Sequence, residues 1–310
     1  MRLTALLRPC VILGLTALTA CGSLPPRTAD TPATTTSAPP SAPLKIGIAL
    51  GGGAAKGFAH IGVIKMLEAN GFAPAVVSGT SAGSVVGALY ASGMNAFELQ
   101  EKAVSLDEAK IRDLQLSSGG LVQGQKLEDY VNQQVQRKPL EQLSKPFVAV
   151  ATRLEDGART VFARGNTGQA VRASSSVPGV FQPVSIGGHD YVDGGLVEPV
   201  PVDAAREMGA EFVIAVNISA DPSSQKNSGQ GGVLLQTTAI MGQSINKMAL
   251  ARADVVIRPD LPDMGGSDFA SRNRAILAGE QATAAALPAL REKLAAARTR
   301  PATPGTVATQ

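Results

Sequence analysis

The amino-acid sequence predicts a three-layer α/β/α fold with a mainly parallel central sheet. Short apolar segments, typical of buried strands, alternate with segments of helical periodicity over most of the 310 residues. Apolar residues make up 44% of the chain, which is enough for a full core. Aromatic residues make up only 4%, so alanine and glycine must provide much of the packing where helices lie close on a sheet.

The folded domain is expected over residues 44–297, followed by a disordered tail at 298–310. Strands are predicted at Leu44–Leu50, Ala75–Ser78, Phe147–Thr152, Thr160–Ala163, Phe212–Asn217 and Asp254–Ile257. Helices are predicted at Phe58–Asn70, Ser81–Ala91, Ala96–Val104, Gln125–Gln136, Gly168–Ser174, Pro201–Met208, Val233–Ala251 and Asp268–Ala296. Strands separated by helices favour a parallel sheet that is covered on both faces.

The residues before this domain resemble a targeting signal and a linker. Residues 1–20 combine two arginines with an apolar run that is too short to span a membrane. They end in Leu18-Thr19-Ala20-Cys21, which resembles a bacterial lipobox and implies cleavage before Cys21 and acylation of that cysteine. An ordinary secretory signal with an incidental cysteine is the alternative. Residues 21–43 are rich in Pro, Thr, Ser and Ala, so we expect a disordered tether.

The location and charge of the mature protein follow from this signal. Gly22 follows the cysteine, a pattern that resembles outer-membrane sorting, so we expect a lipid-anchored envelope protein that faces the periplasm. The signal contains two arginines and no acid, so the net charge of +3 falls to about +1 after cleavage. No basic field for nucleic acid remains. Cys10 leaves with the signal and Cys21 is expected to be lipidated, which excludes a disulfide within the mature chain.

The pentapeptide Gly79-Thr80-Ser81-Ala82-Gly83 has the pattern G-x-S-x-G. It follows the apolar run Ala75–Ser78 and precedes the small-residue helical stretch Ser84–Ala91. This strand–turn–helix context is that of a nucleophile elbow. Gly79 and Gly83 let the chain turn sharply and leave no Cβ to crowd the serine hydroxyl or an incoming ester. Ser81 is therefore a candidate nucleophile.

A glycine-rich loop, Gly51-Gly52-Gly53-Ala54-Ala55-Lys56-Gly57, lies between the first strand and a helix. Small residues there let backbone N–H groups point into one concavity, which suits either a phosphate or the oxyanion of an acyl intermediate. A P-loop requires glycine before the lysine and serine or threonine after it, and this loop has neither. It also completes no G-x-G-x-x-G pattern. We therefore expect no nucleotide. A turn that permits tight helix–strand packing is expected in either case.

The chain has two histidines, which limits the choice of a base. A hydrolase triad of the order Ser, acid, His would require His189, with Asp156 as one acid before it. His189, however, lies in the predicted turn at residues 187–190, between short strand pieces. His60 lies on the first helix, where packing against the sheet or partial solvation is expected. Two histidines without a carboxylate pair form no recognisable metal site. A carboxylate is therefore the favoured base for Ser81.

The segment Asp193-Gly194-Gly195, within Tyr191–Pro199, is by itself an ordinary reverse-turn signal. In order with the glycine-rich loop and the serine pentapeptide, it resembles the patatin-like phospholipase family. Ala173–Pro183 is similar to that family's segment ahead of its catalytic aspartate. The resemblance covers most of residues 45–290. It implies a serine acyl hydrolase in which Ser81 is the nucleophile, Asp193 is its base and an acyl-enzyme forms.

The resemblance also implies that backbone N–H groups of Gly52, Gly53 and Ala54 bind the oxyanion, with Gly51 and Gly57 shaping the loop. Many members carry a fourth glycine where this chain has Ala54, and often arginine where it has Lys56. Alanine keeps its N–H and is tolerated if φ is negative there. Lys56 either steers an anionic headgroup or braces the loop, and bracing is favoured.

The expected substrate is a lipid carboxylic ester, of the phospholipase A, lysophospholipase or simple esterase type. No cofactor and no metal are expected. The membrane is an expected partner through lipidated Cys21. The alternative is a non-catalytic envelope lipoprotein that binds lipid or a partner in the same cleft. Two segments are each either a lid or a plain loop: Phe97–Gln125, and Leu261–Phe269 with its proline and two glycines.

Overall fold

The computed structural model describes residues 44–107, 122–219, 222 and 229–299. The predicted signal, Cys21 and the tether lie outside the described residues. None of the described helices is long and apolar enough to cross a membrane. The described residues all belong to one compact unit.

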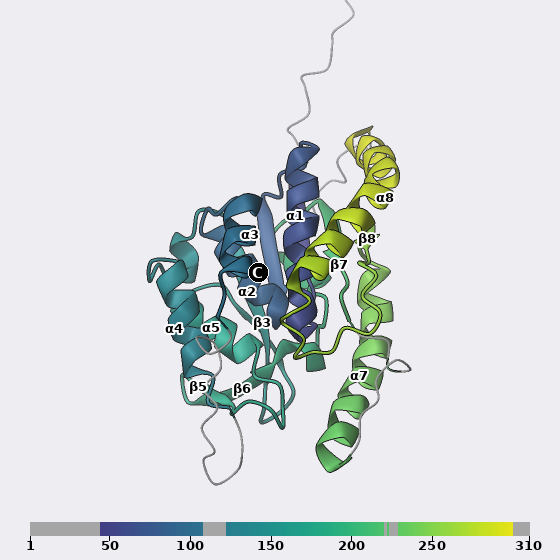
Figure 1. Cartoon of the computed structure of the whole chain (residues 1–310). Helices are drawn as coiled ribbons and strands as arrows, with labels where there is room; N and C mark the ends of the chain where they lie inside the picture. The colour runs from purple at the N-terminus through teal and green to yellow at the C-terminus, as the bar shows by residue number, and fades with distance from the viewer. Residues whose placement is uncertain (1–43, 108–121, 220–221, 223–228, 300–310) are drawn as a thin grey trace, which may run out of the picture. The chain divides into compact units, whose positions relative to one another are not determined.

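The centre of this unit is a mixed sheet (Figure 1). Its strands are β1 (Ile46–Leu50), β2 (Val76–Thr80), β3 (Phe147–Arg153), β4 (Arg159–Phe162), β5 (Val184–Ile186), β6 (His189–Asp193), β7 (Phe212–Val216) and β8 (Val255–Ile257). Strands β3, β2, β1, β7 and β8 pair in that order and are parallel. β4 and β6 pair with β3 and β5 pairs with β6, all antiparallel. The parallel strands are almost entirely buried, as expected for strands with helices on both faces.

Helices cover both faces of the sheet and complete the three layers. They are α1 (Ala59–Ala69), α2 (Ala82–Ala91), α3 (Ala96–Val104), α4 (Gln125–Gln134), α5 (Thr167–Ser174), α6 (Val202–Glu207), α7 (Gly229–Leu250) and α8 (Arg272–Thr299). The larger core joins one face of the sheet to α1, α2, α3, α4 and α8. A smaller core joins alternate strand residues, such as Ala49 and Val213, to α6 and the end of α7. The predicted α/β fold with a central sheet is confirmed.

Most predicted elements are present within a few residues of their expected ends, and β5 and β6 stand where only short strand pieces around a turn were expected. The turn expected at residues 187–190 is shorter, because β6 already begins at His189 and pairs with β5. The C-terminal boundary also differs, since α8 continues to Thr299, past the expected domain end at residue 297. Three short helices were not predicted: η1 (Ala54–Phe58), η3 (Leu140–Gln142) and η4 (Gly194–Leu196).

Candidate active site

Ser81 lies on a sharp turn between β2 and α2, as the pentapeptide predicts. Its backbone has φ 54° and ψ −127°, a conformation that a residue with a side chain rarely adopts. The turn presses α2 onto the end of β1: a Cβ at Gly83 would lie 2.0 Å from the Leu50 carbonyl oxygen. Glycine is therefore required at this position of the elbow. Ser81 is nearly buried in this turn, with 8% of its surface exposed.

Asp193 is the last residue of β6 and is buried. Its Oδ1 accepts a hydrogen bond of 2.7 Å from the Gly195 N–H, so the Asp-Gly-Gly turn orients the carboxyl group. Its Oδ2 is buried and has no hydrogen-bond partner among the described residues. Burial raises the pKa of Asp193 to about 6, against the opposing effects of the Ser81 side chain and the Gly195 N–H. The Ser81 hydroxyl thus lies near this carboxyl group without meeting the geometry of a hydrogen bond.

The register of β3 explains why Ser81 and Asp193 meet. Val150 of β3 pairs with Thr80 of β2 and also with Val161 of β4. The strands β2 and β4 therefore lie on opposite edges of β3. Ala151, the next residue of β3, pairs with Asp193 of β6 and also with Thr160 of β4. Since β4 occupies one edge, β6 lies on the same edge of β3 as β2. The parallel strand β2 and the antiparallel strand β6 therefore meet end to end. Ser81, directly after β2, is brought beside Asp193 at the end of β6.

The glycine-rich loop lies against the nucleophile. A Cβ at Gly52 would lie 3.1 Å from the Cβ of Ser81, and one at Gly57 would lie 2.8 Å from the Cβ of Ala82. The Gly53 and Ala54 N–H groups have no acceptor among the described residues. They are the two loop donors available for an oxyanion.

One expectation for this loop needs correction, and one condition set for it is not met. The expectation concerns the Gly52 N–H, which already donates a 2.9 Å hydrogen bond to the Pro199 carbonyl oxygen and so is not available as a donor in this arrangement. The condition concerns Ala54, where alanine was tolerated if φ is negative, whereas φ is +50° there. This left-handed backbone is the conformation that glycine adopts without steric cost. A fourth glycine would therefore fit the position better than alanine.

Two basic side chains near the loop are buried: His60 of α1, and Lys56 of the loop itself. His60 Nε2 lies 2.8 Å from the Gly51 carbonyl oxygen, and desolvation lowers the pKa of His60 to about 4. The neutral imidazole therefore donates from Nε2 and holds the start of the loop. Burial also lowers the pKa of Lys56, which is 8% exposed and whose ammonium group forms no hydrogen bond or ion pair with another described residue. The polar bracing of the loop thus comes from His60.

The other residues considered for chemistry lie apart from this arrangement. His189 begins β6, is about half exposed, and lies 3.5 Å from Glu155 in a surface pair. Asp156 pairs with Arg153, and this contact lowers the pKa of Asp156 to about 2. The described residues contain no cluster of His, Cys, Asp and Glu that could hold a metal ion.

Two residues that contact the site, Ser174 and Ser176, were not identified from the sequence as contacts. The Ser81 N–H donates to Ser174 Oγ at 2.9 Å, and Ser174 Oγ–H donates to the Val150 carbonyl oxygen at 2.5 Å. The Asp193 N–H donates to the Ser176 carbonyl oxygen at 2.9 Å. Ser174 and Ser176 thus connect the two halves of the site. Their signal was the serine run ahead of Asp193, whose contacts depend on the fold.

Glu198 is a further buried group, and it contacts the end of β2 and the start of α6. It is 3% exposed, and its Oε1 accepts hydrogen bonds from two N–H groups at the start of α6. Its Oε2 accepts a bond of 2.5 Å from Arg159 Nε. The Glu198 carbonyl oxygen accepts a 2.8 Å bond from the Thr80 hydroxyl. Glu198 therefore ties the end of β2 to the segment that follows Asp193.

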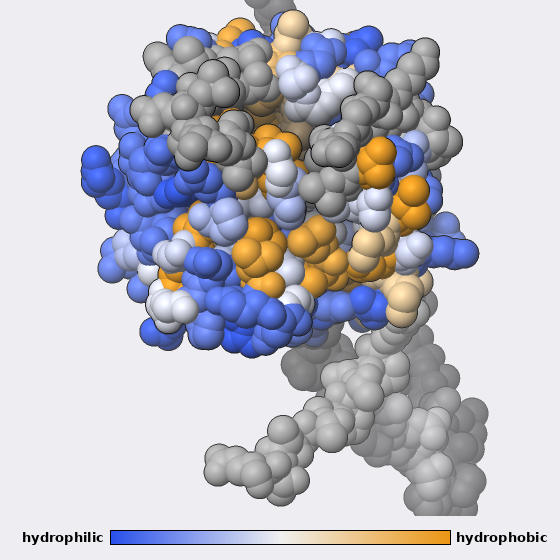
Figure 2. Space-filling view, turned by 90° about the horizontal axis from the view of Figure 1, so that it is seen from below, coloured by the Kyte–Doolittle hydropathy of each residue, from blue (hydrophilic) through white to orange (hydrophobic). Residues whose placement is uncertain are grey.

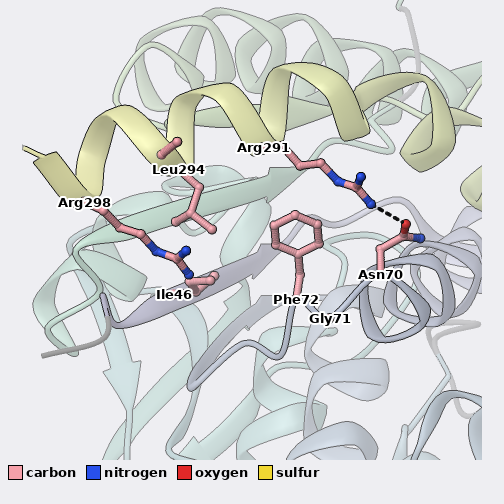
Figure 3. A pocket seen from close by; sticks show the side chains of 8 residues that line it. Ile46, Asn70, Gly71, Phe72, Arg291, Leu294 and Arg298 are labelled. Carbon is pink, nitrogen blue, oxygen red and sulfur yellow. Dashed lines mark hydrogen bonds between the residues drawn. The ribbon is translucent and has the colours of Figure 1, made fainter. Parts of the chain in front are cut away.

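A cavity of about 300 Å³ lies at the opposite end of β1 (Figure 3). Ile46, the first residue of β1, lines it, together with Phe72 and Leu294. Arg291 at its edge donates a 2.9 Å hydrogen bond to Asn70. The glycine-rich loop follows the other end of the same strand, so this cavity is separate from Ser81 and Asp193.

Known proteins with similar sequences share this central region. A family model described as patatin-like phospholipase matches residues 48–206, about half of the chain. An uncharacterized NTE family protein of Mycobacterium tuberculosis is 36% identical over 178 residues, which are 56% of this chain and 49% of that protein. Patatin-like phospholipase domain-containing protein 6 of Homo sapiens is 34% identical over 183 residues, which are 56% of this chain and 13% of that protein. The chain thus spans about half the length, or less, of these curated relatives.

One solved structure supports the fold. The crystal structure of VipD from Legionella pneumophila matches 82% of this chain and 67% of its own, with a TM-score of 0.50 and 16% sequence identity. This likeness shows the shared α/β architecture.

Proposed function

Because the chain belongs to the patatin-like phospholipase family, we propose that it hydrolyses carboxylic esters of lipids through an acyl-enzyme formed on Ser81, with Asp193 as the base. The family supports lipid-ester hydrolysis in general, and the assignment of these two residues is our own proposal. The observation that carries it is the buried Asp193 carboxyl group, whose Oδ2 has no partner within the described part of the chain, beside a serine on a strained turn.

In the first step, the ester carbonyl approaches Ser81 Oγ from the side of the glycine-rich loop. Asp193 Oδ2 accepts the hydroxyl proton as the new C–O bond forms. The Gly195 N–H keeps Oδ1 in place, so the proton goes to the free oxygen. The negative charge that develops on the carbonyl oxygen is stabilised by the N–H groups of Gly53 and Ala54.

In the second step, the ester C–O bond breaks and the alcohol leaves with the proton held by Asp193. A water molecule then attacks the acyl-serine and transfers a proton to Asp193. The tetrahedral intermediate collapses, the fatty acid leaves, and Ser81 regains its proton. A carboxyl pKa near 6 suits both roles, because the group is mostly ionised at neutral pH yet is a stronger base than an exposed aspartate.

The test compares p-nitrophenyl esters of short and long acyl chains as substrates for the full chain and two serine variants. We expect Ser81→Ala to abolish the release of p-nitrophenol. The matched control is Ser92→Ala, at the other end of α2, where the hydroxyl donates to the Leu89 carbonyl oxygen. Equal activity in Ser81→Ala and the control would refute the proposal. Lipid binding without hydrolysis in the parent chain would favour a non-catalytic lipid-binding lipoprotein.

We also propose that the protein is anchored in the cell envelope through acylated Cys21. The support is the lipobox-like segment Leu18–Cys21 and the lipid substrate class. Metabolic labelling with radioactive palmitate, followed by membrane fractionation, tests it. We expect label and membrane association in the parent chain and loss of the label in Cys21→Ser. Label retained in Cys21→Ser would contradict the assignment.

A further inference from the structure

Helix α7 exposes large apolar side chains along one side. Val233 is 62% exposed, Ile240 51%, Met241 57% and Met248 69%. Their spacings of seven, eight and fifteen residues place them within roughly 100° of the helix circumference. We call these four residues the α7 stripe. The helix contains no aspartate or glutamate, and its single basic residue is Lys247 in the last turn.

Helix α7, which carries the stripe, passes beside the candidate active site. α7 packs against η4, the short helix that directly follows Asp193. A Cβ at Gly242 of α7 would lie 3.8 Å from the Gly195 carbonyl oxygen, so the helix passes close to the turn that orients the base. Figure 1 shows that the first turns of α7 extend below β5 and β6 at the bottom of the view. Figure 2, which looks at the molecule from below, shows apolar side chains gathered on this face between hydrophilic ones.

We propose that the α7 stripe docks on the surface of a lipid bilayer and so brings Ser81 to esters that lie at the membrane interface. This inference rests on the proposed function, because a lipid ester is presented at such a surface. A helix with an apolar side and no carboxylate enters the headgroup region of an anionic bilayer without charge repulsion. Lys247 adds a favourable charge at the same side of the molecule.

Burial of the stripe in the interface is a hydrophobic effect. Screening by salt acts on charge pairs and leaves apolar burial in place. Binding through the stripe is therefore expected to persist at high ionic strength. Adsorption driven by surface charge alone would be lost under that condition.

The absence of tryptophan from the chain allows a site-specific fluorescence test. The test uses the full chain with Cys21→Ser, which removes the predicted acylation, and Ser81→Ala, which prevents hydrolysis of the vesicles. Met241→Trp is the reporter. Phe97→Trp on α3 is the matched control, because Phe97 is 71% exposed and α3 covers the other face of the sheet from α6. The probe is vesicles of phosphatidylethanolamine and phosphatidylglycerol.

We expect the vesicles to shift the emission of Met241→Trp to the blue, and brominated lipid to quench it, at low and at high salt. Phe97→Trp should show neither effect. In the same background, Ile240→Gln with Met248→Gln should lower partitioning into vesicles by about tenfold, since two apolar contacts are lost. Phe97→Gln with Leu277→Gln, two exposed apolar residues on α3 and α8, should leave partitioning unchanged.

Three results would overturn the proposal. They are no shift with Met241→Trp, equal shifts with both reporters, and a shift that follows protein concentration without lipid. The last would identify a second copy of the chain as the occupant of the stripe. Failure of the proposed function is distinguishable, because it would abolish Ser81-dependent ester hydrolysis and leave the vesicle-induced shift in place.

Discussion

The two halves of the sheet contribute to the site in different ways. The parallel half provides Ser81 and the glycine-rich loop, and its cost is in the backbone, with φ of 54° at Ser81 and 50° at Ala54. The antiparallel part provides Asp193 on β6, and its cost is electrostatic, because burial raises the carboxyl pKa to about 6. The site is therefore destabilised by torsional strain on one side and by desolvation on the other, so the two sides can be tested separately.

The largest expected effect comes from removing the base on the antiparallel side. Asp193→Asn keeps the size of the side chain but cannot accept the Ser81 proton. We expect kcat/KM for a soluble ester to fall by about 10³-fold or more. In the parent enzyme, kcat/KM should decline as the pH falls below about 6, because protonated Asp193 is no longer a base. Near-normal activity in Asp193→Asn, or a profile without this acidic limb, would exclude Asp193 as the base.

On the parallel side, Gly83→Ala should produce the largest loss of stability. The new Cβ would lie 2.0 Å from the Leu50 carbonyl oxygen, so the elbow can no longer pack on the end of β1. We expect the free energy of unfolding to fall by about 3 kcal/mol, as measured by urea denaturation. Gly265→Ala is the control, because a Cβ there meets no atom within 4 Å. Similar losses in both variants would mean that the contact with β1 does not restrict the elbow.

The parallel side was readable from the sequence because its motifs are local. The serine pentapeptide and the glycine-rich loop each lie between a strand and a helix that are adjacent in the chain. On the antiparallel side Asp193 was identified through the family resemblance, but the pairing of its strand was not, because β6 is short, follows two glycines and pairs with β3, which lies about forty residues earlier. The end-to-end meeting of β2 and β6 depends on register, which a single sequence does not reveal. The same holds for the Gly52 N–H, whose acceptor on Pro199 is distant in the chain.

The electrostatic side should also appear in the dependence of stability on pH. The folded pKa of Asp193 lies above its ordinary value. Its contribution to the free energy of unfolding is therefore full below about pH 4 and is lost as the pH rises through about 6. The folded pKa of His60 lies below its ordinary value of 6.5. Its contribution to the free energy of unfolding is therefore full above that pH and is lost as the pH falls toward about 4. The two effects oppose each other over the same range.

Single variants should separate the pH effects of Asp193 and His60 on stability. Relative to the parent, Asp193→Asn should gain stability as the pH rises from about 4 to 7, and His60→Gln should gain it as the pH falls over that range. Each difference should reach about 3 kcal/mol, from shifts of about two pKa units. Urea denaturation at a series of pH values measures both. Differences that are constant with pH would show that neither group titrates in this range.

The smallest expected effect tests the strain on the parallel side. Ala54→Gly removes the Cβ that disfavours φ of +50°, which relieves about 1 kcal/mol. The greater freedom of glycine in the unfolded chain offsets part of this gain, so the net stabilisation should be about 0.5 kcal/mol. Ala296→Gly, at an exposed position of α8 eight residues past Pro288, should instead destabilise by about 1 kcal/mol. The opposite signs of two identical substitutions, measured by urea denaturation, would place strain at Ala54. Destabilisation of equal size in both variants would mean that φ at Ala54 is negative, and the torsional strain would then rest on Ser81 alone.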